Sequence, residues 1–350
     1  MAGLVRFSQE TSTEKEELGW GEEAGVLEPV KVGVVGIGSM GVHHARVYSE
    51  LPNTELIGLV DIDGNRGELY SKDYHTNFYS DYRTLIEKGV QAVNIAVPTS
   101  LHYPLAVDFI EHGVHVLVEK PITVDLIQAK SLVDLAKKNH CILQVGHLER
   151  FNPAVRKLRS VMGRPVFLES QRISYPTNRN LDVGVVWDLM IHDLDILINL
   201  VKSPVVEIHA MGVSVYSDFE DVAQVHLLFK NGVAASLLAS RISGEKQRSL
   251  RVTEDTGRTL SLDFMNQTLC SMRPPRSGHP VPPELLPVEK DEPLKLELSH
   301  FADCVANHRT PLVSGEDGKR ALELAMQVLA RMKMVKSKAP LGKELIALAG

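Results

Sequence analysis

The sequence predicts an α/β protein in which a doubly wound parallel sheet is followed by an α+β domain with a mostly antiparallel, open sheet. Short apolar runs alternate with amphipathic stretches in the first part of the chain, and period-two alternation replaces this rhythm after Gly146. The chain has 350 residues, more than the ~250–300 at which a single hydrophobic core stops growing. Two domains are therefore expected.

The first domain is predicted from apolar runs of strand length. Parallel strands that are buried on both faces are apolar at successive positions, and the helices that connect them cover the two faces through right-handed crossovers. The expected strands are Val32–Gly36, Leu56–Ile62, Ala92–Val97, Val114–Val118 and Ile142–Val145. Helical spacing lies between them at Ala45–Leu51, Leu101–Glu111 and Ile127–Lys138.

The second domain is predicted from alternating strands that are interrupted by one strongly apolar helix. The expected strands are Val166–Tyr175, Val206–Val215, Val222–Phe229, Ala234–Arg241, Ser249–Thr253 and Thr259–Phe264. The expected helices are about Asn152–Val161, Val185–Val201, Lys295–Asn307 and Glu316–Lys336. The stretch Arg273–Pro293 contains seven prolines and is expected to be a loop or an extended arm.

The negative charge is concentrated at the start of the chain. The formal net charge is −6, and residues 1–30 hold seven Glu against Arg6 and Lys15, a local net of −5. The nearly neutral remainder has no basic field for nucleic acid or for an anionic membrane surface. No secretory signal or membrane span is apparent, so a cytoplasmic protein is expected. Three scattered cysteines, Cys141, Cys270 and Cys304, are expected to be reduced thiols, and no metal site is expected.

The domain boundaries follow from these changes of pattern. Residues 1–29 are expected to be an acidic flexible extension, and residues 30–147 a domain that binds a cofactor. Residues 148–338 are expected to form a domain for substrate and oligomerisation, whose last helix packs back on the first domain. Residues 339–350 are left as a tail.

A glycine motif follows the first expected strand and opens a helical pattern: Gly36-Ile37-Gly38-Ser39-Met40-Gly41. In a strand–turn–helix context the first glycine permits the tight turn, the second lets the backbone approach a pyrophosphate, and the third allows close packing of helix on strand. The helix N-terminus then receives the phosphates. The motif predicts that a dinucleotide binds at Gly36, Gly38, Ser39, Met40 and Gly41.

Asp61 ends the second expected strand, about 20 residues beyond the glycines. A carboxylate there binds the ribose 2′-hydroxyl of NAD and repels the 2′-phosphate of NADP, so NAD is favoured. Two observations leave alternatives open: Arg66 lies close in sequence, and Asp61 could instead cap the following helix. Pro98 and Thr99 follow a strand at the edge of the sheet where such loops line the cofactor site.

Two further motifs carry reactive side chains. Glu119-Lys120-Pro121 ends a strand, which aims Lys120 at the crevice where doubly wound sheets bind ligands. Asp188 and His192 are four residues apart in an apolar helical stretch, so they are expected to share a helix face. Taken alone, Lys120 is more typical of a solvated surface lysine, and the Asp188–His192 pair of a buried salt bridge.

Together these motifs resemble the glucose–fructose oxidoreductase / inositol dehydrogenase (Gfo/Idh/MocA) family of nicotinamide-dependent sugar oxidoreductases. The resemblance covers about residues 30–338 and depends on three marks in order: the glycine turn, Glu119-Lys120-Pro121 and the Asp188–His192 spacing. It implies a Rossmann domain and an enzyme that oxidises the CH–OH group of a sugar. It also implies that Lys120, Asp188 and His192 form the catalytic group, with Glu119 and Lys120 beside the cofactor.

The roles expected of this group follow from the chemistry of alcohol oxidation. Histidine suits the base that removes the hydroxyl proton near neutral pH, which we expect of His192. Lys120 is expected to stabilise the developing alkoxide, and Asp188 to orient the imidazole or Lys120.

The finer resemblance is to the enzymes that oxidise the 3-hydroxyl of UDP-N-acetylglucosamine ahead of amination. It depends on two segments, 146–153 and 311–318. The substrate contacts expected on this basis are Arg150, Asn152, Arg172, Tyr175 and His192, and Arg150, Arg156, Arg172, Arg179 and Arg241 are candidates for a diphosphate site. Two alternatives stay open: a dehydrogenase of a free polyol or aldose such as inositol, and a non-catalytic regulator that binds a dinucleotide.

An oligomer is expected from the second sheet. Helices cover one face of such a sheet, and alternating apolar side chains on the other face would meet water. Val213, Val225, Leu227 and Leu237 are expected on that open face. A homodimer or homotetramer through the sheet is therefore predicted.

Overall fold

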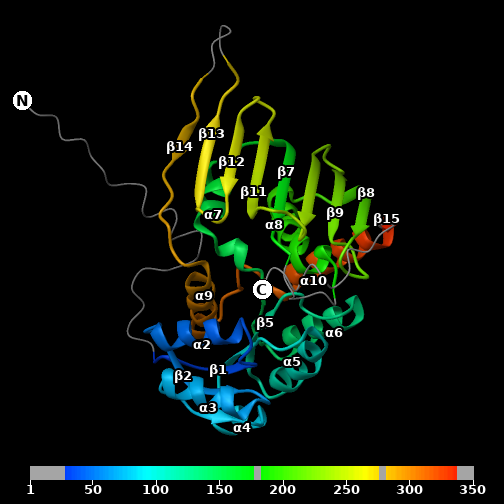
Figure 1. Ribbon diagram of the computed structural model, residues 1–350. Coiled ribbons are helices and arrows are strands. Elements are labelled where there is room, and N and C mark those ends of the chain that lie inside the picture. The colour runs from blue at the N-terminus through cyan, green and yellow to red at the C-terminus, as the bar shows by residue number, and fades with distance from the viewer. Residues whose placement is uncertain (1–27, 177–182, 276–280, 337–350) are drawn as a thin grey trace, which may run out of the picture.

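The computed structural model describes residues 28–176, 183–275 and 281–336, so the acidic start, Arg179 and the C-terminal tail lie outside the described residues. Two sheets lie at opposite ends of the molecule, and helices fill the space between them (Figure 1). Within the described residues no helix is long and apolar enough to cross a membrane.

The first sheet is parallel throughout, and its described strands run in the order β3-β2-β1-β4-β5-β6. This is the doubly wound order of a Rossmann domain. Strands β2 and β3 are added on one side of β1 and strands β4 to β6 on the other, and a binding crevice opens between β1 and β4, where this order switches. The strands are β1 (Val30–Val35), β2 (Thr54–Val60), β3 (Phe78–Tyr79), β4 (Ala92–Ile95), β5 (His115–Glu119) and β6 (Leu143–Gly146). The two-residue strand β3 is too short for sequence periodicity to reveal, and it was not expected.

Helices connect these strands on both faces of the sheet. They are α2 (Gly41–Glu50), α3 (Gly64–Asp73), α4 (Arg83–Glu87), the 3₁₀ turn η1 (Thr99–Leu101), α5 (His102–Glu111) and α6 (Leu126–Lys138). Local chemistry fixes where two of them begin. The carboxylate of Asp63 accepts from the Arg66 backbone N–H at the start of α3, and that of Asp125 accepts from Gln128 at the start of α6.

The second sheet is mostly antiparallel, with described strands in the order β14-β13-β12-β11-β7-β10-β9-β8-β15. The pairs β10–β7 and β15–β8 are parallel. The strands are β7 (Pro165–Ile173), β8 (Val205–Ser214), β9 (Val222–Phe229), β10 (Ala234–Ser240), β11 (Gln247–Glu254), β12 (Thr259–Asp263), β13 (Thr268–Met272), β14 (Glu284–Leu286) and β15 (Met332–Lys336). The predicted fold class is confirmed.

Helices between the sheets cover one face of the second sheet and also reach the first domain. They are the 3₁₀ turn η2 (Leu148–Phe151), α7 (Pro153–Val161), the π-helical turn η3 (Val186–Met190), α8 (Ile191–Val201), α9 (Pro293–Asn307) and α10 (Gly315–Arg331). Helix α9 packs against α2 and β1, and α10 packs against both α8 and α6. Elements late in the sequence therefore help to hold the two sheets in a fixed relation.

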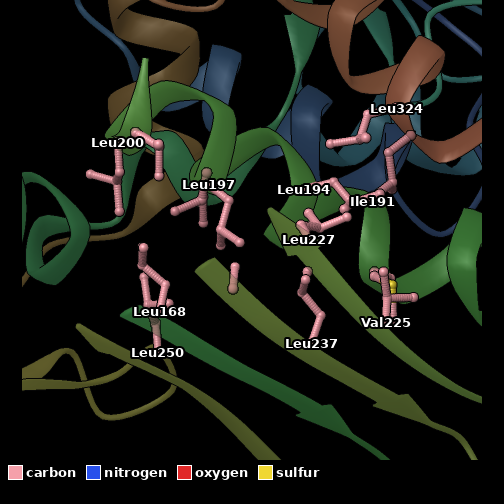
Figure 2. Close-up of a cluster of buried hydrophobic side chains, with 14 of the residues drawn as sticks. Leu168, Ile191, Leu194, Leu197, Leu200, Val225, Leu227, Leu237, Leu250 and Leu324 are labelled. Carbon is pink, nitrogen blue, oxygen red and sulfur yellow. The ribbon is translucent and has the colours of Figure 1, made fainter. Parts of the chain in front are cut away.

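The open face of the second sheet differs from the expectation. Val225, Leu227 and Leu237 are no more than 2% exposed, and they point toward α8, where they pack with Leu194 and Leu197 (Figure 2). Val213, the fourth residue expected on the open face, does lie there. The other three were assigned to the wrong face, because period-two spacing does not tell which side the helices cover. The opposite face carries half-exposed or exposed side chains, among them Met211, Val213, Gln224, His226, Leu228 and Leu238.

The end of the last helix was also predicted wrongly. Helix α10 stops at Arg331, and Met332–Lys336 forms β15, which pairs in parallel with β8. The backbone of β8, unpaired on that side, provides a partner that periodicity within the segment does not reveal. Residues 276–280 of the proline-rich stretch lie outside the described residues, and within the rest of it Glu284–Leu286 pairs with β13.

Candidate active site

The glycine turn has the shape that a pyrophosphate needs. Gly36 has a φ of +91°, and a Cβ there would come within 2.6 Å of the Ala96 carbonyl oxygen. A Cβ on Gly41 would lie 1.8 Å from the Gly36 carbonyl oxygen, so helix and turn could not pack as they do. A Cβ on Gly38 would meet nothing within 4 Å, which leaves room beside the backbone. Helix α2 has no side-chain cap, so no capping side chain competes with phosphate oxygens at its start.

Asp61 lies against this turn. Its carboxylate accepts from the Ile37 backbone N–H at 2.5 Å and from that of Asp63 at 2.8 Å. Because Asp63 is the N-cap of α3, Asp61 does not serve as that cap. Arg66 also lies near the turn, with Nη1 3.5 Å from the Ile37 carbonyl oxygen and Nη2 3.7 Å from Asp63. An acidic and a basic side chain therefore both lie beside the glycine turn.

The loop after β4 is tied to the loop after β5. Pro98 precedes η1, which begins at Thr99, and the buried ring of His102 follows. One nitrogen of His102 lies 2.9 Å from the Val97 carbonyl oxygen, and the other lies 2.9 Å from that of Pro121. This imidazole therefore fixes the spacing of two loops at the carboxyl edge of the sheet.

Lys120 follows β5 at this edge and reaches across to the second domain. Its Nζ donates to the Asp188 backbone carbonyl at 2.7 Å and lies 3.6 Å from an Asp188 carboxylate oxygen. Burial lowers the pKa of Lys120 from its usual value, although the charges of Asp188 and Glu119 oppose that shift. The side chains of Lys120 and Asp188 are 20% and 23% exposed, so a ligand can reach both.

Asp188 lies in the π-helical turn η3, not in a regular helix with His192. A π turn adds a residue to one turn and shifts the faces that precede and follow it, and such turns occur frequently at functional sites. Asp188 and His192 therefore do not lie in one continuous α-helix. The structure instead pairs the Asp188 carboxylate with Lys120.

His192, in the first turn of α8, is held neutral. Burial lowers its pKa well below the usual value, and the nearby charges of Lys120 and Arg172 act in the same direction. Its Nδ1 is buried and has no hydrogen-bond partner within the described part of the chain. A neutral imidazole with a free nitrogen can accept a proton at neutral pH.

Glu119 is held by a buried hydrogen-bond network in the first domain. The His44 Nε2 lies 3.0 Å from its carboxylate, the Asn94 amide donates to His44 Nδ1 at 2.8 Å, and the Tyr48 hydroxyl donates to Asn94 at 2.6 Å. Burial opposes ionisation of Glu119, yet the bond from His44 and the charge of Lys120 lower its pKa overall. The network therefore keeps a fixed negative charge next to Lys120.

His147 was not among the predicted site residues. It follows β6 as Lys120 follows β5, and its ring lies edge-on to that of His192 with centroids 6.3 Å apart. Neither ring nitrogen has a hydrogen-bond partner among the described residues, although the side chain is buried. Burial lowers the pKa of His147. Its position directly after a strand of the parallel sheet was the signal available in the sequence.

Three of the predicted substrate contacts are buried and bonded within the protein. Arg172 donates to both carboxylate oxygens of Asp193, at 2.9 and 3.0 Å, and to Glu149 at 2.9 Å. Arg150 contacts Asp195 at 3.4 Å and donates to the Leu312 carbonyl at 3.0 Å. Asn152 caps α7 and donates to the Phe264 carbonyl. Tyr175, the fourth, is 51% exposed beyond the end of β7.

The other candidate arginines do not gather at one place. Arg241 donates to buried Asp221 at 2.8 Å. Arg156 and Arg150 line a small cavity of about 30 Å³ between α7 and α8, together with Arg159 and Asn199. Arg248, on β11, was not predicted, and its side chain is 37% exposed. Within the described residues no group of His, Cys, Asp and Glu forms a metal site.

The glycine turn, the parallel sheet and a reactive lysine, aspartate and histidine at the sheet edge define a dinucleotide-binding oxidoreductase. Comparison with protein families supports this class. The Gfo/Idh/MocA oxidoreductase family with its NAD-binding Rossmann fold matches residues 30–147, and the C-terminal domain of that family matches residues 154–259. These matches span more than half of the chain, which therefore belongs to the Gfo/Idh/MocA family.

Individual relatives cover almost the whole described fold. The UDP-N-acetylglucosamine 3-dehydrogenase of Acidithiobacillus ferrooxidans is 34% identical over 306 residues, which are 85% of this chain and 96% of the relative. A solved structure of that enzyme aligns with a TM-score of 0.81 at 33% identity, over 87% of this chain and 98% of the other. The scyllo-inositol 2-dehydrogenase (NAD(+)) of Bacillus subtilis is 28% identical over 319 residues, 85% of this chain and 92% of the relative.

Proposed function

We propose that the protein oxidises the 3-hydroxyl of UDP-N-acetylglucosamine to the 3-keto sugar. The observation that carries the proposal is the meeting of Lys120, Asp188 and His192 at the carboxyl edge of the first sheet. The similarity to a UDP-N-acetylglucosamine 3-dehydrogenase, at 34% identity along almost its entire length, favours this substrate.

His192 is the proposed base. A hydroxyl group must lose its proton as its carbon loses a hydride, and a neutral imidazole accepts that proton within hydrogen-bond distance. Lys120 supplies a positive charge that stabilises the alkoxide oxygen as it forms. Asp188 holds the Lys120 ammonium from both its backbone carbonyl and its carboxylate, so its role is to position that cation.

The proposed cofactor is NAD⁺, which supplies the hydride acceptor when it is bound. The turn Gly36–Gly41 and the uncapped start of α2 fit its pyrophosphate. Asp61 is placed beside this turn to accept from ribose hydroxyls, and its charge disfavours the extra phosphate of NADP. Pro98 and Thr99 are proposed to line the same site.

A free polyol such as inositol is the second candidate substrate, because inositol dehydrogenases are also similar along most of this chain. The near-ultraviolet absorbance of NADH separates the two. We expect NADH to form when the protein and NAD⁺ are given UDP-N-acetylglucosamine, and much more slowly with myo-inositol. If the protein oxidises inositol and not UDP-N-acetylglucosamine, inositol would replace UDP-N-acetylglucosamine as the proposed substrate. Binding of NADH without turnover of any sugar would favour a regulatory protein instead.

We further propose that copies of the chain associate through the second sheet. Its uncovered face carries Met211, Leu228 and Leu238 beside polar side chains, and no described helix packs there. Light scattering at micromolar protein is expected to give the mass of a dimer or tetramer. A Leu238→Glu variant should shift that mass toward the monomer.

A further inference from the structure

Arg248 occupies a position that the proposed reaction has not yet used. It lies near the start of β11, directly opposite Arg172 of β7 in the antiparallel ladder. Side chains that face each other across a ladder share one face of the sheet, so both guanidinium groups lie on the helix-covered face. This face leads to α8 and thus to His192.

The two arginines differ sharply in their partners. Arg172 donates three hydrogen bonds to Asp193 and Glu149. Among the described residues, the guanidinium of Arg248 has its one ion-pair contact with the Glu149 Oε1 that Arg172 already holds, and at 3.7 Å this contact is too long for a hydrogen bond. Within the described part of the chain no hydrogen-bond acceptor meets the guanidinium of Arg248.

This arrangement leaves a cation in an unfavourable place. Like charges directly opposite each other in a ladder are destabilising, and Arg248 is only partly accessible to water. Burial and the charge of Arg172 lower the pKa of Arg248 overall, although the charges of Glu149, Asp193 and Asp188 oppose that shift. An anion supplied by a ligand would relieve both penalties and accept hydrogen bonds from the free donors.

The place of Arg248 relative to the reactive groups suggests which anion. Arg248 lies 3.7 Å from Glu149, which accepts from Arg172, and Arg172 in turn donates to Asp193, the residue that follows His192. The charge of Arg248 also lowers the pKa of His192. In a sugar nucleotide the phosphate is attached at C1, and one ring carbon separates C1 from C3. A side chain that binds that phosphate must therefore lie near the base that takes the 3-hydroxyl proton, but not in contact with it.

We propose that Arg248 binds the diphosphate of a nucleotide-sugar substrate and so selects such sugars over neutral polyols. The inference rests on the proposed function and names a residue that determines its substrate class. The planar guanidinium can donate two parallel hydrogen bonds to phosphate oxygens. Arg172, which already donates to Asp193 and Glu149, does not bind the phosphate itself.

The test compares Arg248→Gln with Arg251→Gln. Arg251 is on the same strand, faces the opposite side of the sheet and is 55% exposed, so its loss removes the same charge at a distance from the site. We expect Arg248→Gln to weaken the binding of UDP, measured by calorimetry with NAD⁺ present, by about tenfold to hundredfold. The KM for UDP-N-acetylglucosamine should rise in proportion while kcat changes little. Arg248→Lys should fall between wild type and Arg248→Gln.

Each outcome decides the matter. Unchanged UDP affinity in Arg248→Gln overturns the inference, and equal losses in Arg251→Gln would indicate general surface charge and also overturn it. If the wild-type protein oxidises UDP-N-acetylglucosamine and Arg248→Gln keeps its KM, the inference fails while the proposed function stands. If the wild type oxidises inositol and does not bind UDP, both fail. Thermal unfolding of each variant shows whether a loss of affinity merely reflects a damaged fold.

Discussion

Two neighbouring sets of charged side chains are built on opposite principles. Behind the site, Arg172 is paired with Asp193 and Glu149, and Arg150 with Asp195, all of them nearly inaccessible to water. In the site, Lys120 and His192 have lowered pKa values because they are buried with incomplete partners. In the first set, ion pairs keep the buried side chains charged. In the second set, the lowered pKa values mean that Lys120 and His192 lose a proton more readily.

This difference separates structural from reactive residues better than residue type does. Arginines and aspartates lie in both regions. From the sequence alone, Arg172, Arg150 and Arg248 are equally plausible substrate contacts. Only the partners distinguish them. Arg172 and Arg150 are held by buried carboxylates, whereas Arg248 has a single long contact to Glu149.

The largest expected effect tests the reactive set. His192→Ala removes the proposed base, so kcat is expected to fall by roughly 10²–10⁴, the range for loss of acid–base catalysis. Binding of NADH, followed by its fluorescence, should not change, because the cofactor residues lie in the first domain. Near-normal turnover in this variant would end the assignment of His192.

The next largest effect tests the paired set. Arg172→Gln leaves Asp193 and Glu149 buried without their main partner, so the free energy of unfolding should fall by about 3–5 kcal/mol. Urea denaturation measures this loss. Lys120→Met is the matched control, because it removes a charged side chain from the partly accessible site. It should lower the free energy of unfolding much less and should abolish turnover. Equal stability losses would show that the two regions do not differ as described.

The pH dependence of kcat/KM sharpens the same comparison. Activity requires neutral His192, so it should stay level as the pH falls through 6.5 and then drop about tenfold per unit below its lowered pKa. On the alkaline side the decline should begin below pH 10.5, because the pKa of Lys120 is also lowered. A Lys120→Arg variant that retains activity should show no such alkaline decline, since arginine stays charged.

The smallest effect concerns the choice of cofactor. Asp61→Ser removes the carboxylate beside the glycine turn and should reduce the preference for NAD⁺ over NADP⁺ about tenfold, measured as the ratio of kcat/KM values. Asp63→Ser is the control, because Asp63 caps α3 and serine retains a capping oxygen. An unchanged ratio in Asp61→Ser would limit Asp61 to support of the turn.

Much of the architecture was predictable from local chemistry. The apolar runs of the first sheet, the alternation of the second and the glycine spacing depend on residues close together in sequence, where side-chain period and backbone sterics act directly. The positions of Gly36, Asp61 and Lys120 were predictable for the same reason, because each residue comes directly after a strand.

What the sequence by itself determined is the fold class and the positions of the glycine turn and of Lys120 at the ends of strands. Only the tertiary structure decided the rest: that Val225, Leu227 and Leu237 face helices, that Met332–Lys336 joins β8, and that the Asp188 carboxylate lies near Lys120. The physical reason is common to these cases. Each depends on a partner that is distant in sequence, and the energy of pairing or burying a group depends on that partner rather than on the group's own neighbours in the chain.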